Sequence, residues 1–326
     1  MRVVSLGSGS SGNVLLVEAG PHRRTKLLVD AGLSARLITN RLCTVGVHPS
    51  QLQGILVTHE HSDHVIGLPT LIKYYAIPVI ADPRTYQLLE EGIASGMWRT
   101  DSGRFVSSIK ESGTGPLTNA LSMDNGDEPL DEAEDGLSNN LSSTKCALPA
   151  LPLPVGSSCM IGDIEVTSFS ISHDAVAPCG YLLNAGGCRV CVVTDSGEVT
   201  PTMLEMMQHA DLLVLEANHD RERLLRGPYP YHLKQRILSP TGHLSNDQAA
   251  DAVLRIWRTD GVRWLWLSHL SRTNNTPALA LTSVRARFQA ARANLAQIHI
   301  SVSPPGMGNI WDSTQLWQSP SLWEMA

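Results

Sequence analysis

The sequence predicts an α/β protein in which two mixed β-sheets pack face to face and helices cover their outer sides. Three observations lead to this fold class. Short apolar runs alternate with amphipathic stretches along most of the chain. Several of these runs are apolar on both faces, which is typical of strands buried in layered sheets. The connections between them include both tight hairpins and helical crossovers, so antiparallel and parallel strand pairs should occur together.

These patterns assign an element to most of the chain. Ser245 is the expected N-cap of one helix, with Gln248 in the capping-box position, and Pro277 fits the first turn of another. The expected strands are residues 2–6, 14–18, 26–30, 54–58, 78–81, 164–172, 180–184, 189–194, 212–216, 263–268 and 298–302. The expected helices are residues 34–45, 63–75, 83–91, 200–209, 220–226, 245–258 and 277–291.

Length and composition are those of a globular protein with a substantial core. The chain has 326 residues, of which 42% are hydrophobic and 17% charged, and we expect a single domain over residues 1–326. No window approaches the roughly 18 apolar residues that a membrane span needs. Because the N-terminus turns polar too early for a secretory signal, we expect a cytoplasmic protein without a membrane segment. The sequence contains no signal for the oligomeric state.

Residues 108–157 differ from the rest of the chain. They are rich in Ser, Asn, Gly, Pro and acidic residues and contain no aromatic residue. This composition buries too little apolar surface to offset the entropy of ordering, so we expect a disordered acidic insertion. A small structured lid is the alternative. Residues 111–145 hold eight acids and one lysine, a charge of −7, whereas the whole chain carries −6. The remainder is therefore near neutral, and a nucleic-acid partner is not excluded.

Residues 7–12 read Gly-Ser-Gly-Ser-Ser-Gly, the spacing of a dinucleotide-binding loop. That function requires a helix directly after the glycines. Residues 13–17 are instead mostly apolar and β-branched or leucine. We therefore expect a tight β-hairpin here and no dinucleotide site. Such a loop at the mouth of an active site could present backbone N–H groups to a phosphate.

Four of the expected strands end at a residue that can bind a metal or transfer a proton. These residues are His59, Asp195, Glu216 and His269. Each follows or closes a run that is apolar on both faces. Buried strands that deliver such groups to one edge predict an active site at the rim of a sheet.

The densest cluster is residues 58–64, which read Thr-His-Glu-His-Ser-Asp-His. Three histidines and an aspartate in six residues, directly after a buried strand, are not expected of an ordinary loop. Imidazole nitrogens combined with carboxylate oxygens suit zinc, manganese or iron and do not resemble a magnesium cage. On a turn, His59 and His61 can face one metal ion while Asp63 and His64 face another.

This motif resembles that of the metallo-β-lactamase superfamily, whose fold is an αββα sandwich with metal ions at the sheet edge. His173 in residues 170–174, Asp195 in residues 193–197 and His269 in residues 267–271 match the remaining family positions. The resemblance implies two divalent metal ions, zinc or manganese, with Asp195 between them. One ion would be bound by His59, His61 and His173, and the other by Asp63, His64 and His269.

A closer resemblance is to the YycJ/WalJ-type subgroup, which is related to the RNase Z-like nucleases. It rests on residues 8–13, 215–220, 233–239 and 242–246 and covers nearly the whole chain outside residues 108–157. It implies a phosphodiesterase acting on nucleic acid, with 5′-to-3′ exodeoxyribonuclease as the activity and DNA as the partner. The catalytic residues that it implies are Asp63, Glu216 and His243. In the Glu216–His243 pair, the histidine would protonate the leaving oxygen or stabilise phosphoryl charge.

Two other enzyme classes remain open. A thioester hydrolase of the glyoxalase II type shares the first metal motif but does not need the Glu216–His243 pair. A tRNA 3′-processing endonuclease would use the same chemistry, but no inserted arm for gripping tRNA is recognisable. A regulatory module stabilised by metal would not require so complete a ligand set. Basic residues between Glu216 and His243 fit either a surface that follows a phosphate backbone or a solvated helix face; these are Arg221, Arg223, Arg226, Lys234 and Arg236.

Overall fold

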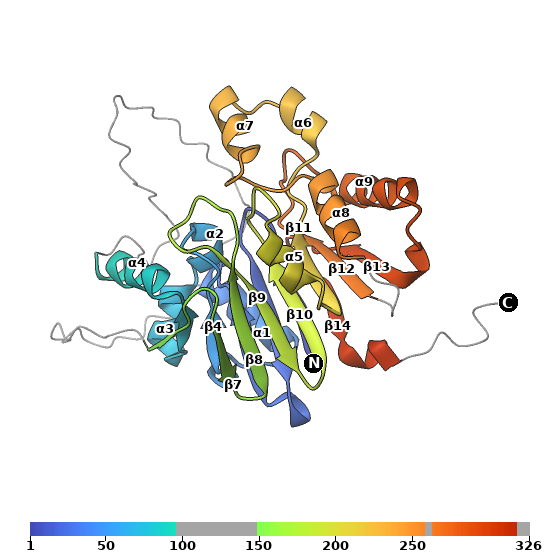
Figure 1. Cartoon of the computed structure of the whole chain (residues 1–326). Coiled ribbons are helices and arrows are strands. Elements are labelled where there is room, and N and C mark those ends of the chain that lie inside the picture. Colours follow the sequence, from blue (N-terminus) through green and yellow to red (C-terminus); the bar gives the residue numbers. More distant parts are fainter. Residues whose placement is uncertain (96–148, 258–262, 318–326) are drawn as a thin grey trace, which may run out of the picture.

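The computed structural model describes residues 1–95, 149–257 and 263–317, which form two seven-stranded β-sheets (Figure 1). The strand order is β14-β1-β2-β3-β4-β5-β6 in the first sheet and β13-β12-β11-β10-β9-β8-β7 in the second. In the first sheet β14 to β3 pair antiparallel and β3 to β6 pair parallel. The second sheet repeats this plan, antiparallel from β7 to β10 and parallel from β10 to β13. The predicted pair of mixed sheets is confirmed.

The first sheet consists of β1 (Arg2–Gly7), β2 (Val14–Ala19), β3 (Thr25–Val29), β4 (Gly54–Leu56), β5 (Val79–Ala81), β6 (Ala150–Pro152) and β14 (Ile310–Asp312). The second consists of β7 (Ser158–Ile161), β8 (Ile164–Ser170), β9 (Cys179–Ala185), β10 (Cys188–Val193), β11 (Leu212–Glu216), β12 (Arg263–Ser268) and β13 (Ile298–Val302). The helices are α1 (Ala35–Thr44), α2 (Ser62–Val65), α3 (Leu68–Tyr75), α4 (Pro83–Ala94), α5 (Pro201–Met207), α6 (Arg221–Arg226), α7 (Tyr231–Ile237), α8 (Asn246–Arg255) and α9 (Pro277–Ala290). Short 3-10 turns occupy Pro21–Arg23, Pro49–Gln51, Leu295–Gln297 and Ser313–Trp317.

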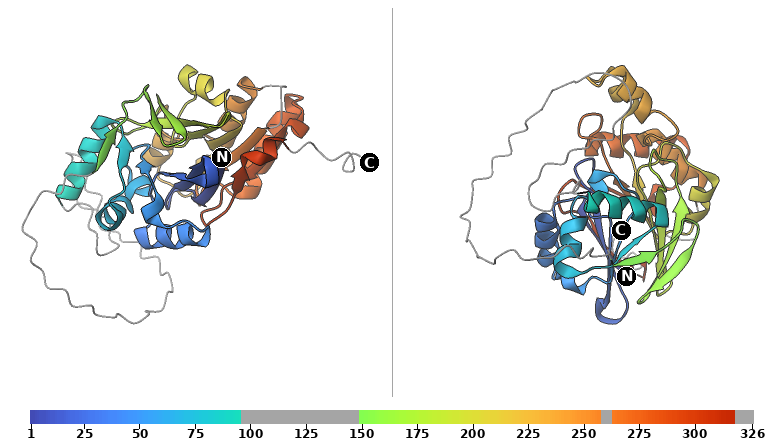
Figure 2. Two further views of the ribbon diagram at one scale, coloured as in Figure 1. Left: turned by 90° about the horizontal axis from the view of Figure 1, so that it is seen from below. Right: turned by 90° about the vertical axis from the view of Figure 1, so that its left-hand side faces the viewer.

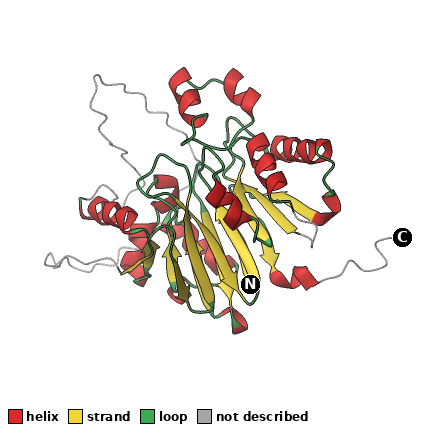
Figure 3. Ribbon diagram, in the orientation of Figure 1, coloured by secondary structure: helices red, strands yellow, loops and turns green. Residues whose placement is uncertain are grey.

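Alternation of side chains along the strands divides the core into three layers. On β3, Leu27 and Val29 face the second sheet, whereas Leu28 faces the helices on the outer side. Cys188 and Cys191 on β10 likewise belong to different layers, so this C-x-x-C pair does not face one point. Helices α1 and α3 cover the first sheet, and α5, α8 and α9 cover the second. The left view of Figure 2 shows helices on the two outer sides of the sandwich, and Figure 3 distinguishes the helices from the strands by colour.

One local prediction was wrong, and several short elements were not predicted. The helix expected over 63–75 is two helices, because the Gly67 N–H donates to the Ala31 carbonyl instead of continuing α2. Residues 231–237 form α7, which was not expected. Strands β7 and β14 were also not assigned from the sequence.

The predicted acidic insertion, residues 108–157, extends too far toward the C-terminus. Residues 108–148 lie outside the described part of the chain. Residues 150–152 instead form β6, which pairs parallel with β5, and Leu153 is buried in the core between the sheets. Backbone hydrogen bonds order this proline-rich segment at the sheet edge: Val79 N–H donates to the Pro149 carbonyl and Leu153 N–H donates to the Ala81 carbonyl.

Within the described ranges, no helix has both the length and the apolar character needed to cross a bilayer. The structure also confirms the expected N-terminal hairpin: β1 and β2 pair antiparallel around residues 8–13.

Gly32 allows the chain after β3 to pack against the metal-motif helix α2. A Cβ atom at Gly32 would lie 1.7 Å from the Asp63 carbonyl oxygen. That carbonyl accepts a hydrogen bond from Asn13 N–H, and Gly32 N–H donates to the Asn13 carbonyl. The segments around residues 13, 32 and 63 therefore meet so closely that no side chain fits at position 32.

We predict that Gly32→Ala lowers the free energy of unfolding by about 1–3 kcal/mol, because the new methyl group must displace backbone. Urea denaturation of the purified protein measures this change. Gly306→Ala is the matched control, since a Cβ there meets no atom within 4 Å. Equal stabilities for the two variants would contradict the close packing at Gly32.

Candidate metal centre and active site

An open cleft lies at the C-terminal ends of the parallel strands. Both sheets contribute to it: the loop after β4 carries the H-x-H-x-D-H motif, and the loops after β8, β10 and β12 carry the other predicted ligands. In Figure 1 helices α6 and α7 stand together above these strand ends. The lining residues are Ser10, His61, Ser62, Asp63, His173, Asp174, Asp195, Asn218, Tyr229, Leu233, Arg236, Ile237, Gly242, His243 and His269.

Six of the seven predicted metal-ligating side chains lie in two groups with the expected members, and the seventh, Asp195, lies close to both. His59, His61 and His173 each place one ring nitrogen within 4.8 Å of the others. Asp63, His64 and His269 form a second group on the same criterion. Asp195 connects the groups, since its carboxylate lies with His59 and His64, and its Oδ2 is 3.0 Å from His64 Nε2.

Hydrogen bonds donated by Nδ1 orient two of these imidazoles. His64 Nδ1 donates to Asp30 Oδ2 at 2.8 Å, and His173 Nδ1 donates to the carbonyls of Thr241 and Gly242 at 3.1 and 3.2 Å. In both rings Nε2 is left as the atom that faces the cluster. Partners that fix the tautomer in this way are characteristic of metal-ligating histidines.

Unpaired buried atoms show that the cluster fits divalent cations. Among the described residues, His59 Nε2 and Asp195 Oδ2 are buried without a hydrogen-bond partner. Leaving such atoms unpaired costs about 1–3 kcal/mol each. His64 Nε2 lies 3.0 Å from Asp195 Oδ2, and when His64 Nδ1 carries the proton of the ring a cation between these two atoms would stabilise the contact. Nitrogen and carboxylate donors at this spacing suit zinc or a similar divalent ion.

Three residues of the site adopt left-handed backbone conformations at the ends of strands. Asp30, Asp195 and His269 have φ of 62°, 59° and 54° and follow β3, β10 and β12. Asp and His tolerate this region better than most side chains, but it still stores strain that the surrounding packing must hold. The strain is concentrated at the cluster, as in many functional sites.

Glu216, at the end of β11, is a completely buried carboxylate that joins four segments. Its Oε1 accepts from His243 Nδ1 at 2.7 Å and from His269 Nδ1 at 2.9 Å. Its Oε2 accepts from the backbone N–H groups of Ser196 and Leu244 at 2.9 and 3.1 Å. The predicted Glu216–His243 pair is therefore assembled, and Glu216 also holds His269.

The same contacts determine the charge of the pair. Burial alone would raise the pKa of Glu216, but the charge of His243 and the hydrogen bonds from His243 and His269 lower that pKa to about 2. Burial alone would lower the pKa of His243, but the Glu216 carboxylate raises it. The pair thus favours a carboxylate beside a proton-carrying imidazole.

Residues outside the predicted site support it. Ser8 Oγ accepts from the His269 N–H at 2.9 Å, and Asn13 Nδ2 lies 3.1 Å from His64 Nε2. The N-terminal loop therefore contacts two members of the second group. Asp30 was missed as a site residue, although it directly follows a buried strand, as His269 follows β12.

The basic stretch after Glu216 is largely occupied by structural contacts. Lys234 Nζ donates to the Leu225 and Gly227 carbonyls, and Arg223 Nε donates to the Thr273 carbonyl. Arg226 pairs with Glu222 on α6. Of the five basic residues considered from the sequence, Arg236 is the one among the lining residues of the cleft.

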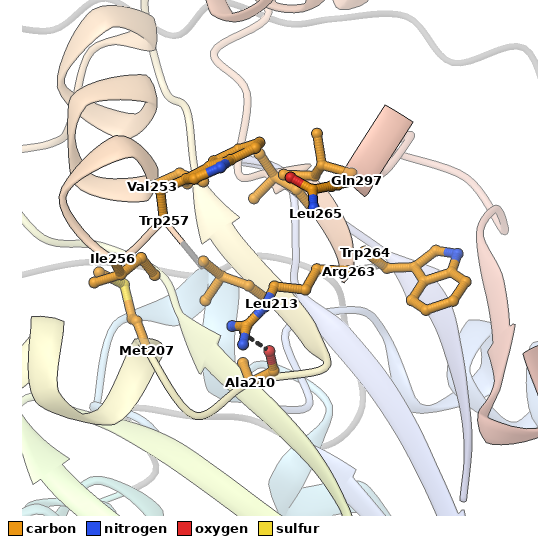
Figure 4. Close-up of a pocket in the computed structure, with 11 residues that line it drawn as sticks. Met207, Ala210, Leu213, Val253, Ile256, Trp257, Arg263, Trp264, Leu265 and Gln297 are labelled. Atoms are coloured by element: carbon orange, nitrogen blue, oxygen red, sulfur yellow. Dashed lines mark hydrogen bonds between the residues drawn. The ribbon is translucent and has the colours of Figure 1, made fainter. Parts of the chain in front are cut away.

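A second cavity lies at the opposite, N-terminal ends of β11 and β12 (Figure 4). Leu213, Trp257 and Leu265 are among the apolar side chains that line it, and Arg263 there donates to the Ala210 carbonyl at 3.0 Å. Its described lining contains no histidine, cysteine or carboxylate. Among its described lining residues this cavity therefore offers no candidate metal ligand.

Comparison with known proteins identifies relatives of the chain. The model of the Metallo-beta-lactamase superfamily matches residues 7–140, and that of the Beta-lactamase superfamily domain matches residues 127–269. The exodeoxyribonuclease WalJ of Streptococcus pneumoniae (serotype 2, strain D39) is 34% identical over 286 residues, 87% of each chain. The exodeoxyribonuclease YycJ of Bacillus anthracis is 34% identical over 279 residues, 86% of each chain. The solved metallo-β-lactamase fold protein YhfI from Bacillus subtilis shares the fold, with a TM-score of 0.60 at 15% identity over 95% of this chain and 99% of its own.

We predict that Asp30→Ala weakens metal binding roughly 10- to 100-fold, because His64 loses the acceptor that fixes its ring. Competition with a coloured chelator measures the affinity. The isosteric Asp30→Asn should show a smaller loss in the same direction. Asp163→Ala is the control, since Asp163 bonds Arg24 and Thr25 away from the cleft. Unchanged affinity in a folded Asp30→Ala protein would contradict this role.

Proposed function

Because the chain belongs to the metallo-β-lactamase superfamily, and within it to the family of the WalJ and YycJ exodeoxyribonucleases, we propose that it is a metal-dependent exodeoxyribonuclease. The observation that carries the proposal is the Glu216–His243 pair, which sits beside the two histidine/aspartate groups in one cleft. The identity of 34% over 87% of the chain to WalJ supports DNA as the substrate. Digestion from the 5′ end and a cytoplasmic location are further parts of the proposal.

We assign two divalent ions, zinc or manganese, to the cleft. His59, His61 and His173 would hold one, Asp63, His64 and His269 the other, and Asp195 would contact both. Ions bound there would supply Lewis acidity toward a phosphodiester and its attacking water. The unpaired His59 Nε2 and Asp195 Oδ2 support this assignment.

His243 is assigned the role of general acid. Its Nδ1 donates to Glu216 Oε1 at 2.7 Å. The other ring nitrogen, Nε2, is therefore the atom that can donate a proton to a substrate in the cleft. A proton on Nε2 can pass to the leaving oxygen of the cleaved strand, and the neighbouring carboxylate stabilises the imidazolium beforehand. Asp63 lines the same cleft with a partly exposed carboxylate. We propose that this carboxylate accepts a proton from the attacking water.

The Glu216–His243 pair distinguishes phosphodiester hydrolysis from thioester hydrolysis. A thiolate is a good leaving group and needs little protonation, whereas the alkoxide that leaves a phosphodiester needs a proton or a positive charge. A buried glutamate that holds a histidine in the cleft therefore favours the phosphodiesterase. A tRNA 3′-processing endonuclease would use the same groups, and the choice of substrate distinguishes it.

The direct test is digestion of end-labelled DNA by the purified protein with manganese or zinc. We expect stepwise release of nucleotides from DNA, little action on RNA, and no hydrolysis of a glutathione thioester. Label at the 5′ end should be released before label at the 3′ end. Hydrolysis of the thioester in preference to DNA would reject the proposal.

Elemental analysis tests the metal assignment separately. We predict close to two ions per chain after reconstitution, and about one or fewer in Asp195→Ala, because a carboxylate between two cations cannot be replaced by water without losing charge. His59→Ala should lose the first ion preferentially. A reconstituted protein without metal would contradict the ligand assignment.

His243→Ala tests the acid. Turnover of DNA should fall roughly 10²- to 10⁴-fold while the metal content and melting temperature stay near those of the unmodified protein. His232→Ala, an exposed histidine of α7, is the matched control. Glu216→Gln should reduce turnover as well, and it should also weaken metal binding because Glu216 holds His269. Full activity of metal-loaded His243→Ala would show that another group protonates the leaving oxygen.

A further inference from the structure

One side of the cleft is formed by a surface that the proposed chemistry does not use. It consists of Tyr229, Leu233, Arg236 and Ile237, from α7 and the segment before it, and we call it the α7 wall. We propose that the α7 wall binds the nucleotide next to the cleaved phosphate. Tyr229 and Leu233 contact its base, and Arg236 contacts a backbone phosphate. This inference rests on the proposed function and identifies the residues that recognise the DNA end.

The chemical composition of the α7 wall matches a nucleotide. Most of the other side chains that line the cleft are histidine, aspartate, serine or asparagine. The wall instead presents an aromatic ring and an isobutyl group, both only partly buried, above the buried Ile237. Hydrolysis itself requires no apolar surface in the cleft. A nucleobase does, because bases bind single-strand nucleases and related proteins mainly by stacking on aromatic and apolar side chains.

The backbone at Tyr229 is constrained before any substrate binds. It lies between Pro228 and Pro230, so proline rings restrict the backbone on both sides. Lys234 then ties α7 to the end of α6 through the Leu225 and Gly227 carbonyls, at 2.8 and 2.7 Å. A ring on so constrained a segment loses little conformational entropy when a base stacks on it.

Arg236 is the cation of the wall. Its Nε donates to Asp174 Oδ2 at 2.7 Å, and its side chain is 61% exposed. Among the described residues that line the cleft, no other is lysine or arginine. The pair with Asp174 uses Nε, so the Nη groups can still donate to a phosphate oxygen. Guanidinium groups suit this contact because they donate through several N–H groups in one plane.

Asp174 places this arginine beside the proposed metal site. Asp174 follows His173 directly, and its Oδ1 is 3.3 Å from His173 Nε2. Asp174 is therefore the single side chain that connects the predicted metal ligand His173 to Arg236. A phosphate that contacts Arg236 would lie near the cleaved bond.

The test compares two single-stranded DNA substrates, one of normal sequence and one whose terminal nucleotides lack bases. For normal DNA we expect Tyr229→Ala to raise KM roughly 10-fold, the usual size of one stacking contact, and to change kcat little. Tyr229→Phe keeps the ring and should stay near the unmodified enzyme. On the abasic substrate, Tyr229→Ala and the unmodified enzyme should have the same KM.

Arg236→Ala should raise KM on both substrates by a similar factor, because it removes a phosphate contact and not a base contact. The dependence of KM on salt concentration should also become shallower, by about one counterion. Tyr231→Ala and Arg226→Ala are matched controls. Tyr231 is 75% exposed on α7, and Arg226 is paired with Glu222 on α6. Dissociation constants for the same oligonucleotides, measured by fluorescence anisotropy with each change made in metal-loaded His243→Ala protein, should follow the same order.

The outcomes separate this inference from the proposed function. If the unmodified enzyme digests DNA but Tyr229→Ala and Arg236→Ala keep its KM, the α7 wall does not recognise the substrate. If Tyr229→Ala raises KM equally on normal and abasic DNA, its effect is structural and base stacking is rejected. Failure of the unmodified enzyme to digest DNA would instead reject the proposed function itself.

Discussion

The buried Glu216 carboxylate is the constraint on which the geometry of the site depends. A negative charge at this depth would cost several kcal/mol if it lacked partners. Its four donors come from the segments at 196, 243–244 and 269. The ends of β10 and β12 and the loop before α8 must therefore meet at β11 in one arrangement. This arrangement places Asp195 and His269 at the metal groups and His243 at the cleft.

The two sheets place an aspartate at equivalent positions. In each, the first strand of the parallel half ends in an aspartate with a left-handed backbone, Asp30 after β3 and Asp195 after β10. Asp30 orients His64 by a hydrogen bond, whereas Asp195 itself faces the cluster. The backbone plan is thus repeated although the sequence shows no repeat. Asp30 supports a predicted metal ligand, and Asp195 is itself positioned to be a metal ligand.

Strong local patterns were sufficient to predict which side chains gather at the sheet edge. Buried strands ending in His59, Asp195, Glu216 and His269 predicted both the sheet edge and the groups gathered there. The misses depend on distant contacts. Helix α7 is short and preceded by prolines, and Lys234 ties it to α6. Strand β6 is ordered by the backbone of β5 despite its prolines, and the role of Asp30 depends on His64, which follows it by 34 residues.

Each of the two ligand groups contains side chains from both sheets. His59 and His61 follow β4 of the first sheet and His173 follows β8 of the second, and the same division separates Asp63 and His64 from His269. A ligand that binds only when both halves are docked stabilises the docked form by mass action. An ion in either group would therefore act as a clamp between the halves of the sandwich. Metal supply in the cell would then govern how long the folded protein survives proteolysis, as well as how fast it works.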